Sequence, residues 1–135
     1  MKPEQFIREY RVEKAREVVA NQPKMNATQY RAKDKKYSSL FKPSPEIVYV
    51  ADLKRLVESL KIINDLGGVE KLTPAFITTD KHVGYTHVRM VGNGRLSFLD
   101  DFCDFIPDGS ISIKRVMTAI RDHESIYGGG ESHAN

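Results

Sequence analysis

The strongest constraint on the fold is an amphipathic stretch near the middle of the chain, from Asp52 to Leu66. Apolar residues recur there three and four positions apart, which places them on one face of an α-helix. They are Leu53, Leu56, Val57, Leu60 and Ile63. Gly67 and Gly68 follow, and Gly67 suits the left-handed conformation that ends a helix, because glycine has no Cβ to clash there. The sequence therefore predicts a helix whose apolar face needs a core.

Two further helices are predicted, one near each end. The first starts at Pro3, a residue favoured in the first turn, and ends before Pro23. Its two apolar sets are offset by about one residue, which predicts either a kink near Arg11 or two short helices. The last helix has Ile113, Val116, Met117 and Ile120 on one face and is capped by Ser110 or Ser112.

The segments between these helices favour strands. Residues 28–31, 36–41 and 46–50 are predicted as a meander of three strands, and residues 75–79 and 83–91 as two more strands. Asn93-Gly94 is a strong turn signal before a return strand at 95–99. We therefore expect an α+β fold, in which a small antiparallel sheet of β-hairpins is packed by two or three helices and the N-terminus is helical.

Composition favours one soluble domain. The chain has 135 residues, 40% of them hydrophobic, which suits a single compact domain at 1–127 followed by a flexible, glycine-rich tail at 128–135. No apolar run approaches the ~20 residues of a membrane span. No signal peptide and no internal repeat are recognised. A cytoplasmic protein is expected, and the sequence leaves homo-oligomerisation open.

No catalytic, metal-binding or cofactor-binding constellation stands out. His82 and His87 lack the further ligands of a zinc site. His123 lies between Asp122 and Glu124, but no nucleophile accompanies it in sequence, and a histidine near a helix end also interacts favourably with the helix dipole. We therefore expect no metal or cofactor, and a protein that is not an enzyme.

Charge is distributed unevenly. Residues 1–50 contain 11 basic and 6 acidic residues, a net charge of +5, whereas residues 51–135 contain 10 basic and 12 acidic residues, a net charge of −2. The basic excess centres on residues 24–42, where aromatic residues are interleaved with cations, as in proteins that bind phosphates and stack on bases. The candidate nucleic-acid contacts are Arg31, Lys33, Lys35, Lys36, Tyr37 and Lys42. The alternative interpretation of these cations is protection of an edge strand.

The densest acidic group follows the hairpin at 83–99. It consists of Asp100, Asp101, Asp104 and Asp108. Apolar residues interrupt the alternating ligand pattern of a calcium loop, so an acidic turn or a protein-docking surface is the preferred interpretation.

Two blocks of the sequence have a familiar pattern: MKPEQFIREYRVEKAREVV at 1–19 and VYVADLKRLVESLKIINDLGGVEKL at 48–72. They resemble small accessory proteins from the early or nonessential regions of lambda-like phages and prophages of enteric bacteria. Those proteins have a glycine near the position of Arg11, and Arg11 departs from that pattern. The resemblance implies a protein of the bacterial cytoplasm that modifies host transcription, replication, recombination or defence by binding a host component, and it carries no catalytic residues.

Two functions are thus expected from different classes. The preferred one is a non-enzymatic protein that binds a host protein through the acidic group or through exposed β-hairpins. The alternative is a nucleic-acid-binding protein that uses the basic stretch at 24–42.

Overall fold

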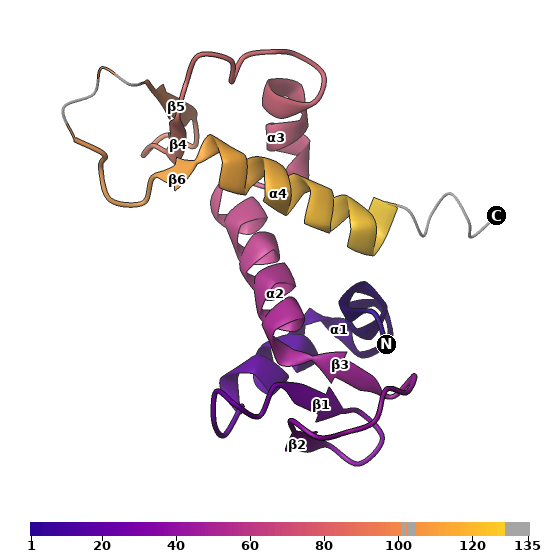
Figure 1. The fold of residues 1–135 in the computed structure, drawn as a ribbon. Coiled ribbons are helices and arrows are strands. Elements are labelled where there is room, and N and C mark those ends of the chain that lie inside the picture. Colours follow the sequence, from indigo (N-terminus) through magenta and orange to yellow (C-terminus); the bar gives the residue numbers. More distant parts are fainter. Residues whose placement is uncertain (101, 103–104, 129–135) are drawn as a thin grey trace. The chain divides into compact units, whose positions relative to one another are not determined.

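The computed structural model describes residues 1–100, 102 and 105–128. Within this part, four α-helices accompany two antiparallel sheets of three strands each (Figure 1). The α+β class and the helical N-terminus are confirmed. Of the predicted tail at 128–135, residues 129–135 lie outside the described residues.

The chain divides into two compact units, whereas one compact domain over 1–127 was predicted. Unit 1 contains residues 1–58 and the C-terminal segment from Glu124, and unit 2 contains residues 59–123. Helix α2, Val50–Asp65, begins in unit 1 and ends in unit 2. Each unit has its own sheet.

Unit 1 contains α1 at Pro3–Ala20, β1 at Gln29–Arg31, β2 at Lys36–Ser38, β3 at Ile47–Tyr49 and the short π-helix η1 at Glu124–Gly128. Its strand order is β2-β1-β3, so β3 pairs with β1 and the predicted meander is wrong. The segment from β2 to β3 must therefore cross β1. The buried apolar residues of unit 1 are Phe6, Ile7, Ala15, Val18, Tyr30, Ile47, Val48, Val50, Leu53, Leu56 and Ile126.

Unit 2 contains α3 at Val69–Phe76, β4 at His87–Met90, β5 at Leu96–Leu99, β6 at Ile111–Ser112 and α4 at Ile113–His123. The predicted strand at 75–79 is wrong, because Ala75 and Phe76 are buried in the last turn of α3 despite the preceding Pro74. The hairpin at Asn93-Gly94 is confirmed. Ser112 caps α4, since its Oγ accepts a 3.1 Å hydrogen bond from the amide of Arg115. The buried core of unit 2 is Ile63, Leu66, Leu72, Ala75, Phe76, Val88, Ile113, Val116, Ala119 and Ile120.

The two units repeat one topology, although no repeat was recognised in the sequence. In each unit a helix precedes three strands, the first strand is central, and the third strand passes directly into a helix (Figure 1). The order β2-β1-β3 in unit 1 corresponds to β5-β4-β6 in unit 2. Unit 2 is therefore a structural repeat of unit 1.

Hydrogen bonds fix which residues correspond. The amide of Val50 donates to the carbonyl of Thr28 at 2.9 Å, and the amide of Ile113 donates to the carbonyl of Thr86 at 2.9 Å. From this anchor, Thr28-Gln29-Tyr30-Arg31 aligns with Thr86-His87-Val88-Arg89. The paired strands extend the match: Tyr30 lies opposite Tyr37, and Val88 lies opposite Phe98.

The correspondence includes the helix break before each sheet. Arg11 interrupts α1 with φ 75° and ψ 162°, which confirms a kink there. Gly68 precedes α3 with φ 98° and ψ 162°. Val-Glu-Lys follows in both units, at 12–14 and at 69–71. The same backbone break is thus occupied by arginine in unit 1 and by glycine in unit 2.

Candidate docking surface

The basic stretch of unit 1 is built around an arginine that is already paired. Arg31, at the end of β1, donates from Nε and Nη2 to both carboxylate oxygens of Asp34 at 2.8 and 2.7 Å. Its guanidinium carbon also lies 4.1 Å from the centre of the Phe41 ring. Asp34 therefore balances the charge of Arg31. The hydrogen bonds from Arg31 lower the pKa of the Asp34 carboxyl.

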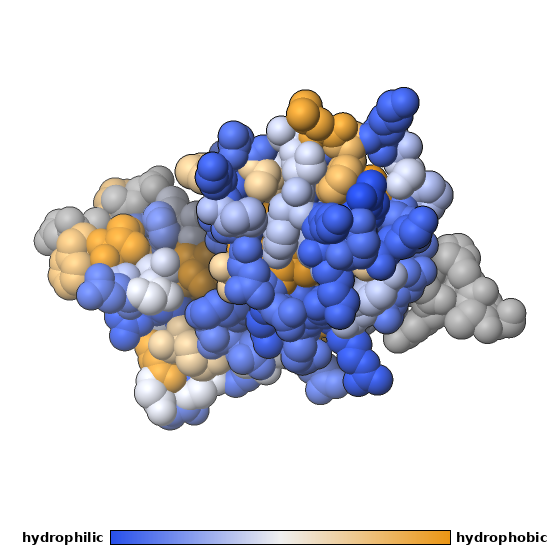
Figure 2. Space-filling model, turned by 90° about the horizontal axis from the view of Figure 1, so that it is seen from below, coloured by the Kyte–Doolittle hydropathy of each residue, from blue (hydrophilic) through white to orange (hydrophobic). Residues whose placement is uncertain are grey.

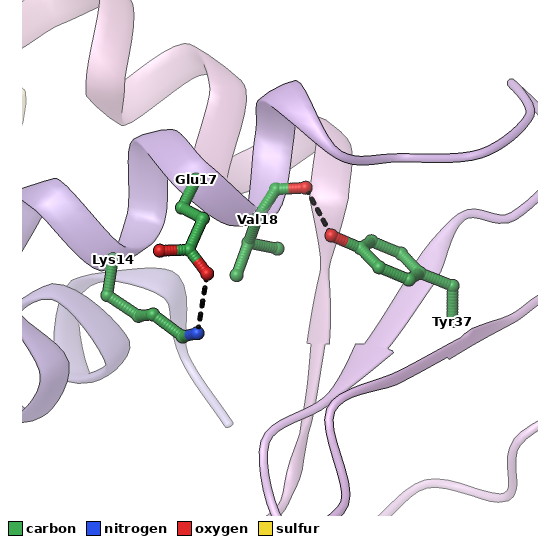
Figure 3. Close-up of polar contacts among 4 residues, drawn as sticks. All are labelled: Lys14, Glu17, Val18 and Tyr37. Carbon is green, nitrogen blue, oxygen red and sulfur yellow. Dashed lines mark hydrogen bonds and ion pairs between the residues drawn. The ribbon is translucent and has the colours of Figure 1, made fainter.

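Tyr37 is also engaged within unit 1. Its hydroxyl donates a 2.6 Å hydrogen bond to the carbonyl oxygen of Val18 on α1 (Figure 3). Burial raises the pKa of Tyr37, and its ring packs against Tyr30 with centroids 5.0 Å apart. Figure 3 also shows the 3.0 Å ion pair between Lys14 and Glu17 on the same helix. The Tyr37 ring is therefore half-buried in the packing between sheet and helix.

The lysines of the basic stretch remain on the surface. Lys33, Lys35, Lys36 and Lys42 are all exposed; Lys33 and Lys35 lie in the β1–β2 turn, and Lys36 is the first residue of β2. A wide hollow of about 520 Å³ lies beside this turn. It is lined by Arg31, Lys33, Asp34, Ser44, Pro45 and Glu46. Because two cations and two carboxylates line it, the hollow is not strongly electropositive.

The acidic group of unit 2 lies in the segment from β5 to β6. Asp100 follows β5 and is half-buried, and Asp108 is exposed. Asp101 and Asp104 lie outside the described residues. No role was predicted for the apolar residues between these aspartates. Phe102 is 91% exposed, Phe105 is 74% exposed and Ile106 is 43% exposed.

Met25 at 92% and Leu40 at 87% are as exposed, but Phe102, Phe105 and Ile106 lie within five residues of one another. Hydrophilic residues cover most of the face shown in Figure 2, and grouped apolar residues on a surface often mark an interaction site. The sequence contains a sign of this exposure. The apolar residues of Phe-Cys-Asp-Phe-Ile lie within a run of aspartates, in a segment that has a turn and shows neither helical nor strand periodicity. We call residues Asp100, Phe102, Phe105, Ile106 and Asp108 the acidic-aromatic loop.

Unit 1 holds the corresponding segment against its sheet. Both crossing segments contain a Phe-X-Pro sequence, Phe41-Lys42-Pro43 and Phe105-Ile106-Pro107. The amide of Phe41 donates to Oε1 of Gln29 at 3.0 Å, and Nε2 of Gln29 donates to the carbonyl of Phe41 at 3.2 Å. With the Arg31 guanidinium over its ring, Phe41 is half-buried.

The residues that hold Phe41 are replaced in unit 2. Gln29 corresponds to His87, whose Nδ1 lies 3.0 Å from the hydroxyl of Thr86 rather than against the crossing segment. Asp34 lies three residues after Arg31. The residue three positions after the corresponding Arg89 is Gly92, which has no carboxylate. An imidazole cannot donate to and accept from one peptide group as an amide does. The positions that hold Phe41 in unit 1 are thus occupied by different residues in unit 2, where Phe105 is exposed.

The histidines have structural environments. His82 stacks on Phe76 with centroids 5.0 Å apart, and its Nδ1 lies 3.0 Å from the carbonyl of Ala75. Burial lowers the pKa of His123. Among the described residues, no three side chains of His, Cys, Asp or Glu are grouped as metal ligands would be.

Comparisons with known proteins returned no matching family model, no similar curated protein and no similar solved structure. In the described part of the chain, no helix combines the length and the apolar character needed to cross a membrane.

Proposed function

We propose that this chain is a non-enzymatic accessory protein of a lambda-like phage or prophage that binds a host protein through the acidic-aromatic loop. The observation that supports this most is the exposure of Phe102 and Phe105 beside Asp100 and Asp108. The corresponding segment of unit 1, by contrast, keeps its phenylalanine half-buried.

The two phenylalanines provide apolar area for binding. Burying one such side chain from water contributes roughly 1.5–3 kcal/mol, so two of them at the centre of an interface supply a large part of a specific binding energy. Segment 96–112 contains four aspartates and no Lys, Arg or His, a net charge of −4. Acidic residues around an apolar centre favour a partner with an apolar pocket and a basic rim.

The test is capture from an enteric bacterial lysate by the tagged protein, with nuclease-treated and untreated halves compared by mass spectrometry. We expect one stoichiometric protein in both halves, and its loss when Phe102→Ser and Phe105→Ser are combined. The matched control is Leu40→Ser, because Leu40 is 87% exposed in the corresponding segment of unit 1. Equal capture by the double variant and the wild type would exclude the acidic-aromatic loop as the docking surface.

A second candidate function is nucleic-acid binding by the β1–β2 turn, favoured by the exposure of Lys33, Lys35, Lys36 and Lys42. With Arg31 and Tyr37 engaged inside unit 1, this function depends on phosphate contacts alone. It predicts an affinity that falls steeply with salt and is abolished when Lys33, Lys35 and Lys36 are all replaced by Glu. An affinity for duplex DNA or single-stranded RNA that stays flat between low and physiological salt would rule it out.

A further inference from the structure

Strand β5 is an edge strand whose outer hydrogen-bonding groups face away from the sheet. It pairs only with β4 among the described strands. The carbonyl of Arg95 accepts from the amide of Val91 at 2.9 Å, and the carbonyl of Leu99 accepts from the amide of Thr86 at 2.8 Å. Because successive residues of a strand point alternately to its two sides, the peptide groups of Leu96 and Phe98 point outward.

This edge lacks the protection found in unit 1. Natural sheets commonly protect an edge with a charged side chain, most often lysine. In unit 1, β2 carries Lys36, which lies opposite Arg31. The N-terminal ammonium of Met1 donates to the carbonyl of Ile47, at 2.6 Å, on the other edge strand. In β5 the residue that corresponds to Lys36 is Ser97, and all four residues of β5 are uncharged.

The acidic-aromatic loop continues directly from this open edge. Asp100 follows Leu99, and the exposed Phe102 comes two residues later. An added strand along β5 would satisfy the outward peptide groups of Leu96 and Phe98 while its end lies beside Asp100. Arg95 precedes β5 and Asp100 follows it, so a basic residue is attracted at the end of the added strand that lies beside Asp100.

We propose that the β5 edge binds an extended, basic segment of the partner protein as an additional strand. This inference rests on the proposed function and names the chemistry of the partner: backbone hydrogen bonds provide affinity, and a basic side chain at the end beside Asp100 provides selectivity. Phe102 and Phe105 supply apolar contacts beyond the end of the added strand.

The direct test uses a ten-residue peptide of alternating Lys and Val with the full-length protein. Amide exchange is followed by NMR. At a peptide concentration ten times the Kd, exchange at Leu96 and Phe98 is expected to slow about elevenfold, as 1 + [L]/Kd requires. The amides of Ser97 and Leu99, which already point toward β4, serve as internal controls. Peptides with Glu in place of Lys, or with a central Pro, should not protect Leu96 or Phe98.

Substitutions at Ser97 distinguish the effect of charge at this position from the effect of side-chain size on peptide binding. Its neighbours Leu96 and Phe98 pack against the core of unit 2, so the Ser97 side chain is on the opposite face of the sheet. Ser97→Lys, which transfers the edge residue of unit 1 to unit 2, is expected to weaken peptide binding at least about tenfold, a change of 1.4 kcal/mol. Ser97→Glu is expected to tighten it. Lys36→Ser is the matched control in unit 1 and should leave the affinity unchanged.

Three results would overturn the inference: protection at residues other than Leu96 and Phe98, equal weakening by Lys and Glu at position 97, or protection that appears on raising the protein concentration without peptide. The last result would identify a second copy of this chain as the occupant. If a captured host protein is lost with the Phe102 and Phe105 substitutions but retained by Ser97→Lys, the docking loop stands and the added strand does not.

Discussion

Replacing Arg11 by glycine should stabilise the protein, because the backbone at this position suits glycine. With φ 75° and ψ 162°, Arg11 is in a region that residues with a Cβ rarely adopt, and such a conformation costs roughly 1–3 kcal/mol. Gly68 has the corresponding conformation in unit 2, where no Cβ is present to strain it. The Arg11 side chain is exposed, so its removal loses little packing.

The magnitude follows from two opposing contributions. Relief of the strain favours Arg11→Gly, while the greater freedom of glycine in the unfolded chain opposes it by roughly 0.5–1 kcal/mol. We expect a net gain of about 1 kcal/mol in the free energy of unfolding. For a chain of this length that corresponds to a rise of about 3–6 °C in Tm.

The assay is urea unfolding followed by circular dichroism, with the midpoint compared at constant m-value. Arg11→Ala is the control for the side chain, because alanine removes the guanidinium and keeps the Cβ; its stability should stay within about 0.5 kcal/mol of wild type. Gly68→Ala should destabilise by about 1 kcal/mol or more, although its Cβ would meet no atom within 4 Å. A loss of stability in Arg11→Gly would refute the assignment of strain to this position.

Three other perturbations test the same structure. Tyr37→Phe removes the hydrogen bond to the carbonyl of Val18 and should lower the free energy of unfolding by about 1 kcal/mol, measured in urea. Gln29→His copies the unit 2 residue and should release Phe41, seen as faster chymotryptic cleavage after that residue; an unchanged rate would contradict the role given to the glutamine amide. Burial lowers the pKa of His123 below 6.5, so the unfolded chain binds a proton more readily than the folded chain does. The free energy of unfolding should therefore fall as the pH drops below about 6.5. A His123→Asn variant should show a shallower decline between about pH 7 and 5.

Local features were predictable because their causes lie within a few residues. The 3.6-residue period of apolar side chains predicted α2 and α4. Of the two serines predicted to cap α4, Ser112 does so. The offset between the apolar sets of α1 indicated the kink at Arg11. Asn93-Gly94 determined the β4–β5 hairpin through the backbone preferences of those two residues.

The candidate sites were predictable only in part. The acidic composition of segment 100–108 was evident in the sequence, whereas the exposure of Phe102 and Phe105 was evident only in the structure. Arg31 and Tyr37 belong to a basic, aromatic stretch by composition, but Asp34 and the Val18 carbonyl engage them. Composition indicates which groups are present and does not indicate which are already satisfied.

The α+β class, the main helices, the break at Arg11 and the uneven charge follow from periodicity, backbone preference and residue type, and could therefore be predicted. The pairing of β3 with β1, the helical end at residues 75 and 76, and the repeat of unit 1 in unit 2 became apparent from the fold alone. These outcomes depend on partners distant in sequence. Short strands have too few side chains to specify their neighbours, so pairing and burial are settled by the core that each unit forms.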